Sequence, residues 1–254
     1  MILAVDVGNT NIVLGFLDGN ELVNECRLST AVDDSAEEYA IKLNSIFEIC
    51  KINTADIEGS VLSSVVPPLN RTISKAIMLI TGKTPIVVGP GVKTGLNIKT
   101  NNPAELGADM VVGAVAGIAK YPCPQIIFDL GTATTASVID KNGCFIGCSI
   151  LCGAKTSLNA LSSGTAQLPQ IEIVEPQSVI GTNTIDCMRS GIVYGTAAMI
   201  DGLIKRFEKE LGDKATVIIT GGLGTIISKF CESEVIVDKN LLIDGLRIIY
   251  EKNK

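Results

Sequence analysis

Two short segments of the sequence combine an aspartate, a glycine and small hydroxyl or amide residues directly after an apolar run. They are Asp6-Val7-Gly8-Asn9-Thr10 and Asp129-Leu130-Gly131-Thr132-Ala133-Thr134. A glycine lets a ligand approach the main chain, and amide and hydroxyl groups can donate hydrogen bonds to phosphate oxygens. A carboxylate is the kind of oxygen ligand that Mg²⁺ prefers. These residues therefore indicate the binding of a phosphate group together with its metal ion.

Each segment taken alone could be an ordinary turn, and it is their repetition that favours a functional site. Both follow a predicted strand, Ile2–Val5 or Ile126–Phe128, and both lead into a second predicted strand that ends in turn residues. The repeat indicates two related halves with a nucleotide bound between them. We expect Asp6 to hold Mg²⁺ directly or through water. Two carboxylates near one polyphosphate need cations between them, so we expect Asp129 to bind a monovalent or divalent cation.

Two further places in the sequence could carry chemistry. Asp109 stands at the start of a predicted helix of small residues, just after the long loop Gly89–Pro103. Its carboxylate could cap the helix or act as a general base, and the sequence alone leaves both open. The glycines of Gly221-Gly222-Leu223-Gly224 follow a predicted buried strand, where they would let a base or ribose lie on the backbone. An ordinary tight turn is the alternative there.

Predicted strands and helices alternate in both halves of the chain, after an antiparallel start. This pattern predicts an α/β protein with helix-covered mixed sheets in two domains, residues 1–121 and 122–254, with a cleft between them. The boundary is placed at Tyr121-Pro122-Cys123-Pro124, because prolines end a helix. The longest expected helical region is Thr182–Leu211, with Gly191 and Gly195 on a tightly packed face. The other expected elements are hairpin Ile2–Leu17, strands Glu21–Ser29, Gly59–Val66 and Thr216–Thr220, and helices Leu69–Thr81, Leu106–Lys120, Thr156–Ser163 and Leu241–Tyr250.

The composition narrows the class of protein. Hydrophobic residues make up 46% of the 254 residues and charged residues 19%, which is enough to build a sizeable core. The formal net charge is −6 and no basic tract is present, so nucleic-acid binding is not expected. No apolar run approaches the roughly 18–20 residues of a membrane span. The chain opens directly as a strand without an export signal, which predicts a cytoplasmic protein.

Histidine is absent, and this removes histidine-assisted nucleophiles and histidine metal sites together. Any general base must then come from Asp, Glu, Lys, Tyr or Cys. The eight cysteines are expected to be reduced thiols. Cys144, Cys148 and Cys152 have a regular four-residue spacing that could serve a metal, but small buried thiols in a core are the favoured interpretation.

The order and spacing of several motifs resemble the type III pantothenate kinases over nearly the whole chain. The Asp6–Asn11 turn is shared across the actin, Hsp70 and sugar-kinase superfamily. The pairing of Gly107-Ala108-Asp109 with Asp129-Leu130-Gly131-Thr132-Ala133-Thr134-Thr135 is much more specific. Further matching segments are Asn102-Pro103-Ala104-Glu105-Leu106, Thr165-Ala166-Gln167-Leu168-Pro169, Gly181-Thr182-Asn183-Thr184 and Thr220-Gly221-Gly222.

The resemblance implies two actin-like (ribonuclease H-like) domains, a homodimer, and ATP-dependent phosphorylation of pantothenate, the first step towards coenzyme A. It also implies a need for Mg²⁺ and a monovalent cation, K⁺ or NH₄⁺. Carried over by position, Asp109 would be the general base, Asp6 would serve Mg²⁺ and Asp129 the monovalent cation. ATP would be held by Asp6, Val7, Gly8, Asn9, Thr10, Asn11, Gly131, Thr132, Gly221 and Gly222. Pantothenate would be held by Thr100, Gly107, Ala108, Met110 and Thr184.

Three positions depart from the family pattern. Met110 stands where the family usually has an arginine, which is expected to contact the substrate carboxylate. Thr100 stands where many members have tyrosine, and Cys152 replaces the proline of a Pro-Gly pair. Two alternatives therefore stay open beside pantothenate kinase. One is a related small-molecule kinase with a different acceptor, and the other is a non-catalytic relative that binds nucleotide or pantothenate and acts through a protein partner.

Overall fold

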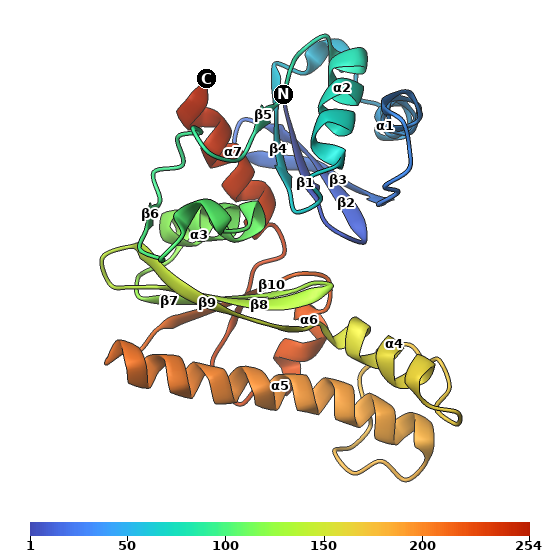
Figure 1. Cartoon of the computed structure of the whole chain (residues 1–254), viewed down its shortest axis with the longest axis vertical. Helices are drawn as coiled ribbons and strands as arrows, with labels where there is room; N and C mark the ends of the chain where they lie inside the picture. Colours follow the sequence, from blue (N-terminus) through green and yellow to red (C-terminus); the bar gives the residue numbers. More distant parts are fainter. The chain divides into compact units, whose positions relative to one another are not determined.

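The computed structural model describes residues 1–254, and its first sheet has five strands in the order β3-β2-β1-β4-β5 (Figure 1). Strands β1 (Ile2–Val7), β2 (Asn11–Asp18) and β3 (Glu21–Ser29) form an antiparallel meander. Strand β4 (Gly59–Ser64) runs parallel to β1, and β5 (Ile86–Val87) runs parallel to β4. The predicted hairpin and the third strand are therefore confirmed, and β1 lies at the centre of the sheet.

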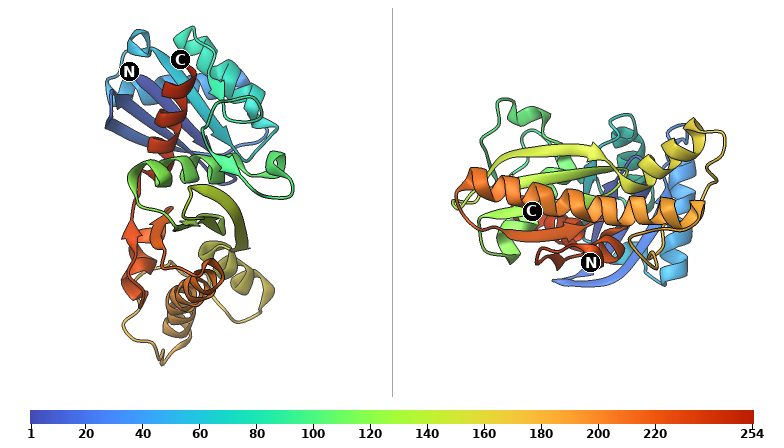
Figure 2. Two further views of the ribbon diagram at one scale, coloured as in Figure 1. Left: turned by 90° about the vertical axis from the view of Figure 1, so that its left-hand side faces the viewer. Right: turned by 90° about the horizontal axis from the view of Figure 1, so that it is seen from below.

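Helices cover both faces of this sheet. The helices α1 (Ala36–Cys50) and α2 (Leu69–Thr81) bury their apolar sides with alternate residues of the strands. The opposite face carries α7 (Leu241–Asn253), which lies across the strands in the left view of Figure 2. Gly15 and Gly59 allow this close approach, because a Cβ at Gly15 would lie 2.7 Å from Cγ2 of Ile243 and one at Gly59 would overlap the ring of Tyr250.

The second sheet has six strands in the order β11-β10-β7-β8-β9-β6. Its antiparallel meander is formed by β7 (Gln125–Leu130), β8 (Ala133–Ile139) and β9 (Cys144–Cys152). Strand β10 (Thr216–Thr220) runs parallel to β7, and β11 (Ile236–Val237) runs parallel to β10. The short β6 (Asn97–Ile98) adds to β9, so the predicted loop Gly89–Pro103 contains one two-residue strand that was not predicted.

The two sheets repeat one plan. In each, three antiparallel strands are followed along the chain by two parallel strands added beside the first. The strands β1 and β7 are both six residues long, show the same order of buried and half-buried positions, and carry an aspartate at the fifth position. Their antiparallel partners β2 and β8 also share their burial pattern over seven positions. The internal repeat predicted from the two Asp-x-Gly segments is thus present in the structure.

The helices of the second sheet include the longest one in the chain, α5 (Thr184–Leu211), which runs along the sheet below β7 and β8 in Figure 1. It begins at Asn183, whose side chain accepts a hydrogen bond from the Asp186 N–H, and it ends at Gly212 in the left-handed conformation. The shorter helices of this region are α4 (Ala154–Gly164), α6 (Gly224–Ile227) and the 3₁₀ turn η3 (Ser228–Phe230).

Contacts divide the chain into two units that do not follow chain order. Unit 1 comprises Met1–Leu96, Asn102–Ala116 and Leu241–Lys254, and unit 2 comprises Asn97–Asn101 and Gly117–Asn240. The expected division into residues 1–121 and 122–254 differs because α7 returns to the first sheet, where Leu241, Ile243, Leu246 and Ile249 are buried. The change between units also falls inside α3 (Ala108–Lys120) rather than at its end. The 3₁₀ turns η1 (Thr54–Asp56) and η2 (Pro103–Glu105) belong to unit 1.

The expectation that Gly191 and Gly195 lie on a tightly packed face is wrong for this chain. Both are exposed, and a Cβ on either would meet no atom within 4 Å. Their spacing does place them on one side of α5, but the buried side is made by other residues, among them Ile192, Val193, Ala197 and Ile200. None of the helices in the structure is both long enough and apolar enough to cross a membrane.

Candidate functional site

The first Asp-x-Gly turn joins β1 to β2 in unit 1. The Gly8 N–H donates to the carbonyl of Asn11 at 3.0 Å, which closes the turn, and a Cβ on Gly8 would lie 3.0 Å from that same oxygen. Asn9, Thr10 and Asn11 are exposed at its tip, whereas Asp6 is half-buried on β1. The turn thus presents amide and hydroxyl groups to solvent beside a carboxylate that is held by a central strand.

Ser63 lies beside Asp6 and is not among the residues predicted from the sequence. The parallel register pairs Asp6 with Ser63, so their side chains lie on the same face of the sheet, opposite the α1 and α2 core. Ser63 is fully buried, and its Oγ has no hydrogen-bond partner. A buried hydroxyl without a partner is costly, so this position fits a water or another polar group beside the Asp6 carboxylate. Only the strand register, which cannot be read from the sequence, places it there.

The second Asp-x-Gly turn joins β7 to β8 in unit 2 and is one residue shorter. Its Gly131 N–H donates to the carbonyl of Ala133 at 3.1 Å. The carbonyl of Thr132 accepts hydrogen bonds from Thr156 Oγ1 at 2.7 Å and from the Gly153 N–H at 3.2 Å. Gly153 has no room for a side chain, because a Cβ would overlap the carbonyl oxygens of Gly131 and Thr132. The start of α4 therefore packs directly against this turn and hydrogen-bonds to it.

Asp129 and Gly221 meet in unit 2, as two of the predicted site residues. The register of β7 and β10 pairs Asp129 with Thr220, directly before Gly221. Gly221 has φ +89°, a conformation that favours glycine, and a Cβ there would lie 2.5 Å from Asp129 Oδ1. Gly222 follows it at an exposed position. Gly221 is thus required to make space for the carboxylate, in addition to any contact with a ligand.

Asp109 occupies the first turn of α3, after Gly107 and Ala108. Its Oδ1 accepts a hydrogen bond from the Met110 N–H at 2.8 Å, and a Cβ on Gly107 would lie 2.6 Å from the same oxygen. Burial raises the pKa of the Asp109 carboxyl above its ordinary value, and the hydrogen bond from the Met110 N–H opposes this effect. A carboxylate with a raised pKa is a stronger base than an exposed one, which suits proton abstraction near neutral pH.

Two of the predicted substrate residues lie in unit 2. Thr100 follows β6, and its Oγ1 is buried without a hydrogen-bond partner. Thr184 is the exposed first residue of α5 and lines a cavity of about 700 Å³ between α4 and α5. The apolar walls of this cavity include Leu161, Leu168, Met188 and Ile192. The cavity is large enough for a small organic molecule, and Thr182 and Thr184 contribute hydroxyl-bearing residues to its lining.

A sequence model of the type III pantothenate kinase family matches residues 2–206 of this chain. The chain belongs to the type III pantothenate kinases. A type III pantothenate kinase of Exiguobacterium sp. is 48% identical over 254 residues, and one of Halalkalibacterium halodurans is 44% identical over 253 residues. In both comparisons the match covers 100% of each chain. The resemblance drawn from the motifs is therefore confirmed, and the chain is a kinase.

Solved structures of lower identity share the fold. The activator of 2-hydroxyisocaproyl-CoA dehydratase from Clostridium difficile, with bound ADPNP, superposes with a TM-score of 0.61 at 14% identity, covering 99% of this chain and 95% of that one. Component A of (R)-2-hydroxyglutaryl-CoA dehydratase from Acidaminococcus fermentans gives 0.57 at 16% identity, covering 98% and 96%. With the two mixed, helix-covered sheets, these neighbours confirm the predicted actin-like fold class.

The cysteine row of this pantothenate kinase lies along β9. Cys144 is buried, as expected for a small core thiol, whereas Cys148 and Cys152 are exposed, which the core interpretation did not predict. Regular alternation would put all three on one face, but the pairing of β8 with β9 shifts register between Phe145 and Gly147, and only beyond this irregularity does β9 alternate between exposed and half-buried positions. No group of three or more Cys, Asp or Glu side chains in the structure is arranged to hold a metal ion on its own.

Proposed function

We propose that this chain transfers the γ-phosphoryl group of ATP to pantothenate and so forms 4′-phosphopantothenate, the first step of coenzyme A biosynthesis. The observation that carries the proposal is 48% identity over the full length to a type III pantothenate kinase. In the reaction, the hydroxyl oxygen of pantothenate attacks the γ-phosphorus, the bond from that phosphorus to the bridging oxygen of ADP breaks, and the hydroxyl proton passes to a base.

Asp109 is proposed as that base. Burial raises the pKa of its carboxyl, and its Oδ1 accepts a hydrogen bond from the Met110 N–H in the first turn of α3. Phosphoryl transfer has a loose transition state, so the attacking hydroxyl loses its proton late and a carboxylate is a sufficient base. The chain contains no histidine that could take this role. Gly107, Ala108 and Met110 are proposed to line the acceptor side beside it, with Thr100 and Thr184 as further substrate contacts.

The two Asp-x-Gly turns are proposed to bind ATP with its cations. Asp6, Val7, Gly8, Asn9, Thr10 and Asn11 would hold the phosphates, with Gly131 and Thr132 contributing from the second turn and Gly221 and Gly222 near the adenosine. The residues fit hard cations, since Asp6 has the unpaired hydroxyl of Ser63 beside it and Asp129 is an oxygen donor held by β7. Asp6 would hold Mg²⁺ and Asp129 would hold K⁺ or NH₄⁺, and the positive charge of these cations would offset the negative charge of the phosphates.

We further propose that the enzyme works as a homodimer in the cytoplasm. The family resemblance motivates the dimer, and the exposed side of α5 with Gly191 and Gly195 supports it, because small exposed residues let helices approach closely. All eight cysteines are free thiols, which suits a reducing compartment.

A coupled assay of ADP release tests the function. Purified protein with ATP, Mg²⁺ and millimolar pantothenate should release ADP in the presence of K⁺ and much less in its absence, and mass spectrometry should detect the phosphorylated product. No turnover in any of these mixtures would reject pantothenate kinase activity. Equal rates with and without K⁺ would reject only the monovalent cation at Asp129.

A related kinase with another acceptor is the second candidate, because Met110 replaces the usual arginine at the acceptor side. Loss of that cation favours an acceptor that is uncharged or differently shaped where pantothenate has its carboxylate. A panel of small alcohols, including pantothenate amides, in the same assay discriminates the two. Preference for the amides over pantothenate by kcat/KM would favour this candidate.

A further inference from the structure

Thr30, the first residue after β3, makes two hydrogen bonds to the first Asp-x-Gly turn. Its hydroxyl Oγ1 donates to the carbonyl oxygen of Gly8 at 2.7 Å. Its backbone N–H donates to the carbonyl oxygen of Thr10 at 3.0 Å. One half-buried residue thus holds the carbonyl groups of two of the three residues that connect β1 to β2.

These bonds set the direction of the N–H groups in the turn. In a trans peptide the C=O and the N–H point in opposite directions, and the one cis bond of the chain is Cys123–Pro124. The N–H of Asn9 and the N–H of Asn11 therefore point away from Thr30. Glycine tolerates both orientations of the peptide that follows it, so the bond from Thr30 Oγ1 to Gly8 selects one of them. Backbone N–H groups presented by a turn can donate hydrogen bonds to a bound anion.

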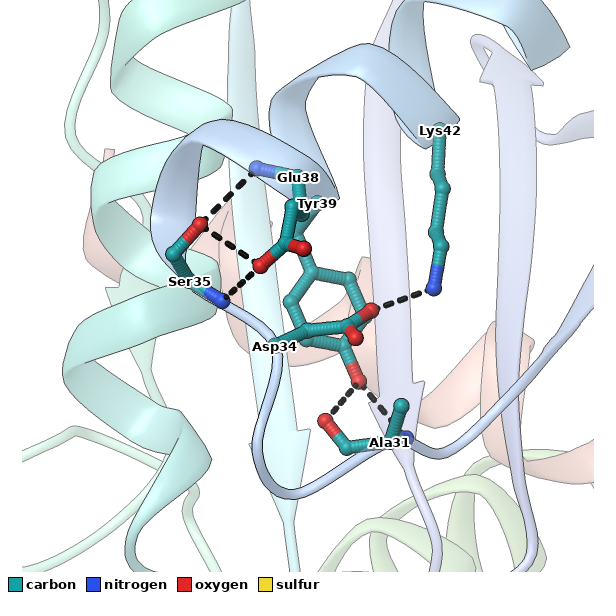
Figure 3. Close-up of polar contacts among 6 residues, drawn as sticks. All are labelled: Ala31, Asp34, Ser35, Glu38, Tyr39 and Lys42. Carbon is teal, nitrogen blue, oxygen red and sulfur yellow. Dashed lines mark hydrogen bonds and ion pairs between the residues drawn. The ribbon is translucent and has the colours of Figure 1, made fainter.

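Thr30 is itself held in place through the next residue. The side-chain oxygen of Tyr39 accepts from the Ala31 N–H at 2.9 Å and donates to the Ala31 carbonyl at 3.0 Å (Figure 3). Tyr39 is fully buried in α1. The start of α1 is fixed by the capping box of Ser35 and Glu38 and by an ion pair of Asp34 with Lys42, all drawn in Figure 3. The segment between β3 and α1 is therefore rigidly attached to the helix.

We propose that Thr30 is a positioning residue for nucleotide binding, whose hydroxyl orients the Gly8–Asn9 peptide so that the turn donates N–H groups to the polyphosphate of a nucleoside di- or triphosphate. The proposal rests on the proposed function to the extent that it takes this turn as the nucleotide site. Thr30 acts through its hydrogen bonds to Gly8 and Thr10, without itself touching the ligand.

The test compares three variants of the full chain. Thr30→Val keeps the shape and the backbone bond but removes the hydroxyl, and Thr30→Ser keeps the hydroxyl. Thr81→Val is the matched control, since Thr81 Oγ1 donates to the Ile77 carbonyl at 2.8 Å in α2 of the same unit. Calorimetry measures the dissociation constant of ADP with Mg²⁺, kinetics measure KM for ATP and for pantothenate, and thermal unfolding measures stability.

We expect Thr30→Val to weaken ADP binding about five- to tenfold, which corresponds to one hydrogen bond. KM for ATP should rise by a similar factor, while KM for pantothenate stays unchanged. Thr30→Ser should restore most of the affinity. Thr81→Val should lower the unfolding temperature without a change in either constant. A purely structural role for Thr30 would give Thr30→Val the same behaviour as this control.

The outcomes that overturn the proposal are equally specific. ADP binding by Thr30→Val as tight as by the wild type would reject it, and so would a wild-type protein that binds no ADP at all. Wild-type protein that binds ADP but does not phosphorylate pantothenate would reject only the proposed function, and the Thr30 comparison would still decide. Tyr39→Phe is the second variant if Thr30→Val does not fold. It removes the anchor of Ala31, and we expect about threefold weaker binding of ADP, with unchanged binding counting against the proposal.

Discussion

Asp129 and Gly221 are packed so closely that a single methyl group on the glycine would lie 2.5 Å from the carboxylate oxygen of the aspartate. The contact joins the end of β7 to the end of β10, two neighbouring parallel strands. It gives Gly221 a role that precedes any ligand, because the position of a proposed cation-binding carboxylate depends on the absence of a side chain there.

Gly221→Ala should therefore disturb the cation site as well as the backbone. We expect a loss of about 3 kcal/mol of stability from the positive φ and the overlap with Asp129 and Leu130. Gly212→Ala is the control, since Gly212 has φ +70° but open space around it, and it should cost about 1 kcal/mol. Only Gly221→Ala should raise the K⁺ concentration needed for half-maximal activity. If both variants needed the same K⁺ concentration, the result would argue against Asp129 as a ligand of the monovalent cation.

Asp109→Asn should remove activity and increase stability. We expect kcat to fall by about 10²- to 10⁴-fold because the base is lost. Burial raises the pKa of Asp109 in the folded state, so its ionised form is disfavoured there and costs stability at pH values above that pKa. Asp109→Asn should then unfold at a higher temperature than the wild type at pH 7, and the difference should shrink as the pH falls through the folded-state pKa and vanish below the ordinary aspartate pKa.

The pH dependence of kcat/KM in the wild type provides a second test of the raised pKa of Asp109. The acid limb of kcat/KM should lie above the ordinary aspartate value of about 3.9. Asp18→Asn, an exposed position at the end of β2, removes the same charge and should change neither the activity nor the unfolding temperature. An acid limb at or below the ordinary value would argue against Asp109 as the base.

Met110→Arg should strengthen pantothenate binding. The arginine would supply a charge-assisted hydrogen bond to the substrate carboxylate, typically worth about 1.5–3 kcal/mol, so KM for pantothenate should fall at least tenfold. KM for ATP should not change. Met78→Arg makes the same substitution on an exposed methionine of α2 and should leave both constants alone. An unchanged KM in Met110→Arg would mean that another group already holds the carboxylate.

Cys26 on β3 and Cys50 at the end of α1 are placed to form a disulfide under a thiol oxidant. Their Sγ atoms are 3.2 Å apart, and both are free thiols. Burial and the hydrogen bond with Cys50 raise the pKa of Cys26 to about 11, so cross-linking by diamide should be faster at pH 9 than at pH 7. Peptide mass spectrometry should find the cross-link, with loss of two hydrogens, and thermal unfolding should show about 3 kcal/mol of stabilisation.

Cys26→Ser provides the control for this cross-link, because it leaves the exposed Cys148, Cys152 and Cys187 in place. Oxidised Cys26→Ser should show neither the cross-linked peptide nor the stabilisation. A cross-link to another cysteine in the wild type, or none at all, would contradict the geometry of this pair.

The features that were predictable from sequence are local ones. Each Asp-x-Gly unit consists of consecutive residues that form a strand, a turn and a second strand. The pairs β1–β2 and β7–β8, and their repetition, could therefore be predicted. Asp109 at the start of α3 follows from the same kind of local signal. These segments also carry the family motifs, which is why the fold class and the family could be named before the structure.

The features that were missed depend on contacts between distant residues. Ser63 lies beside Asp6 only because β4 adds to β1 in one register, and Thr30 reaches Gly8 only because β3 pairs with β2. The spacing of Gly191 and Gly195 places two residues without side chains on the same side of a helix, but it does not indicate whether another element packs there. The expected domain boundary followed chain order, whereas the apolar side of α7 is buried on the first sheet.

This return of α7 has a consequence for how the protein is made. Unit 1 contains the first strand and the last helix, and its Asn253 side chain also bonds the backbone of Lys93. Until residues 241–253 have been translated, α7 cannot cover its face of the first sheet. The turn proposed to bind ATP then belongs to a sheet that is covered on one face only. All residues of unit 2 lie at or before Asn240, so they are synthesised before α7. The half that begins the chain is thus the last to be completed during synthesis.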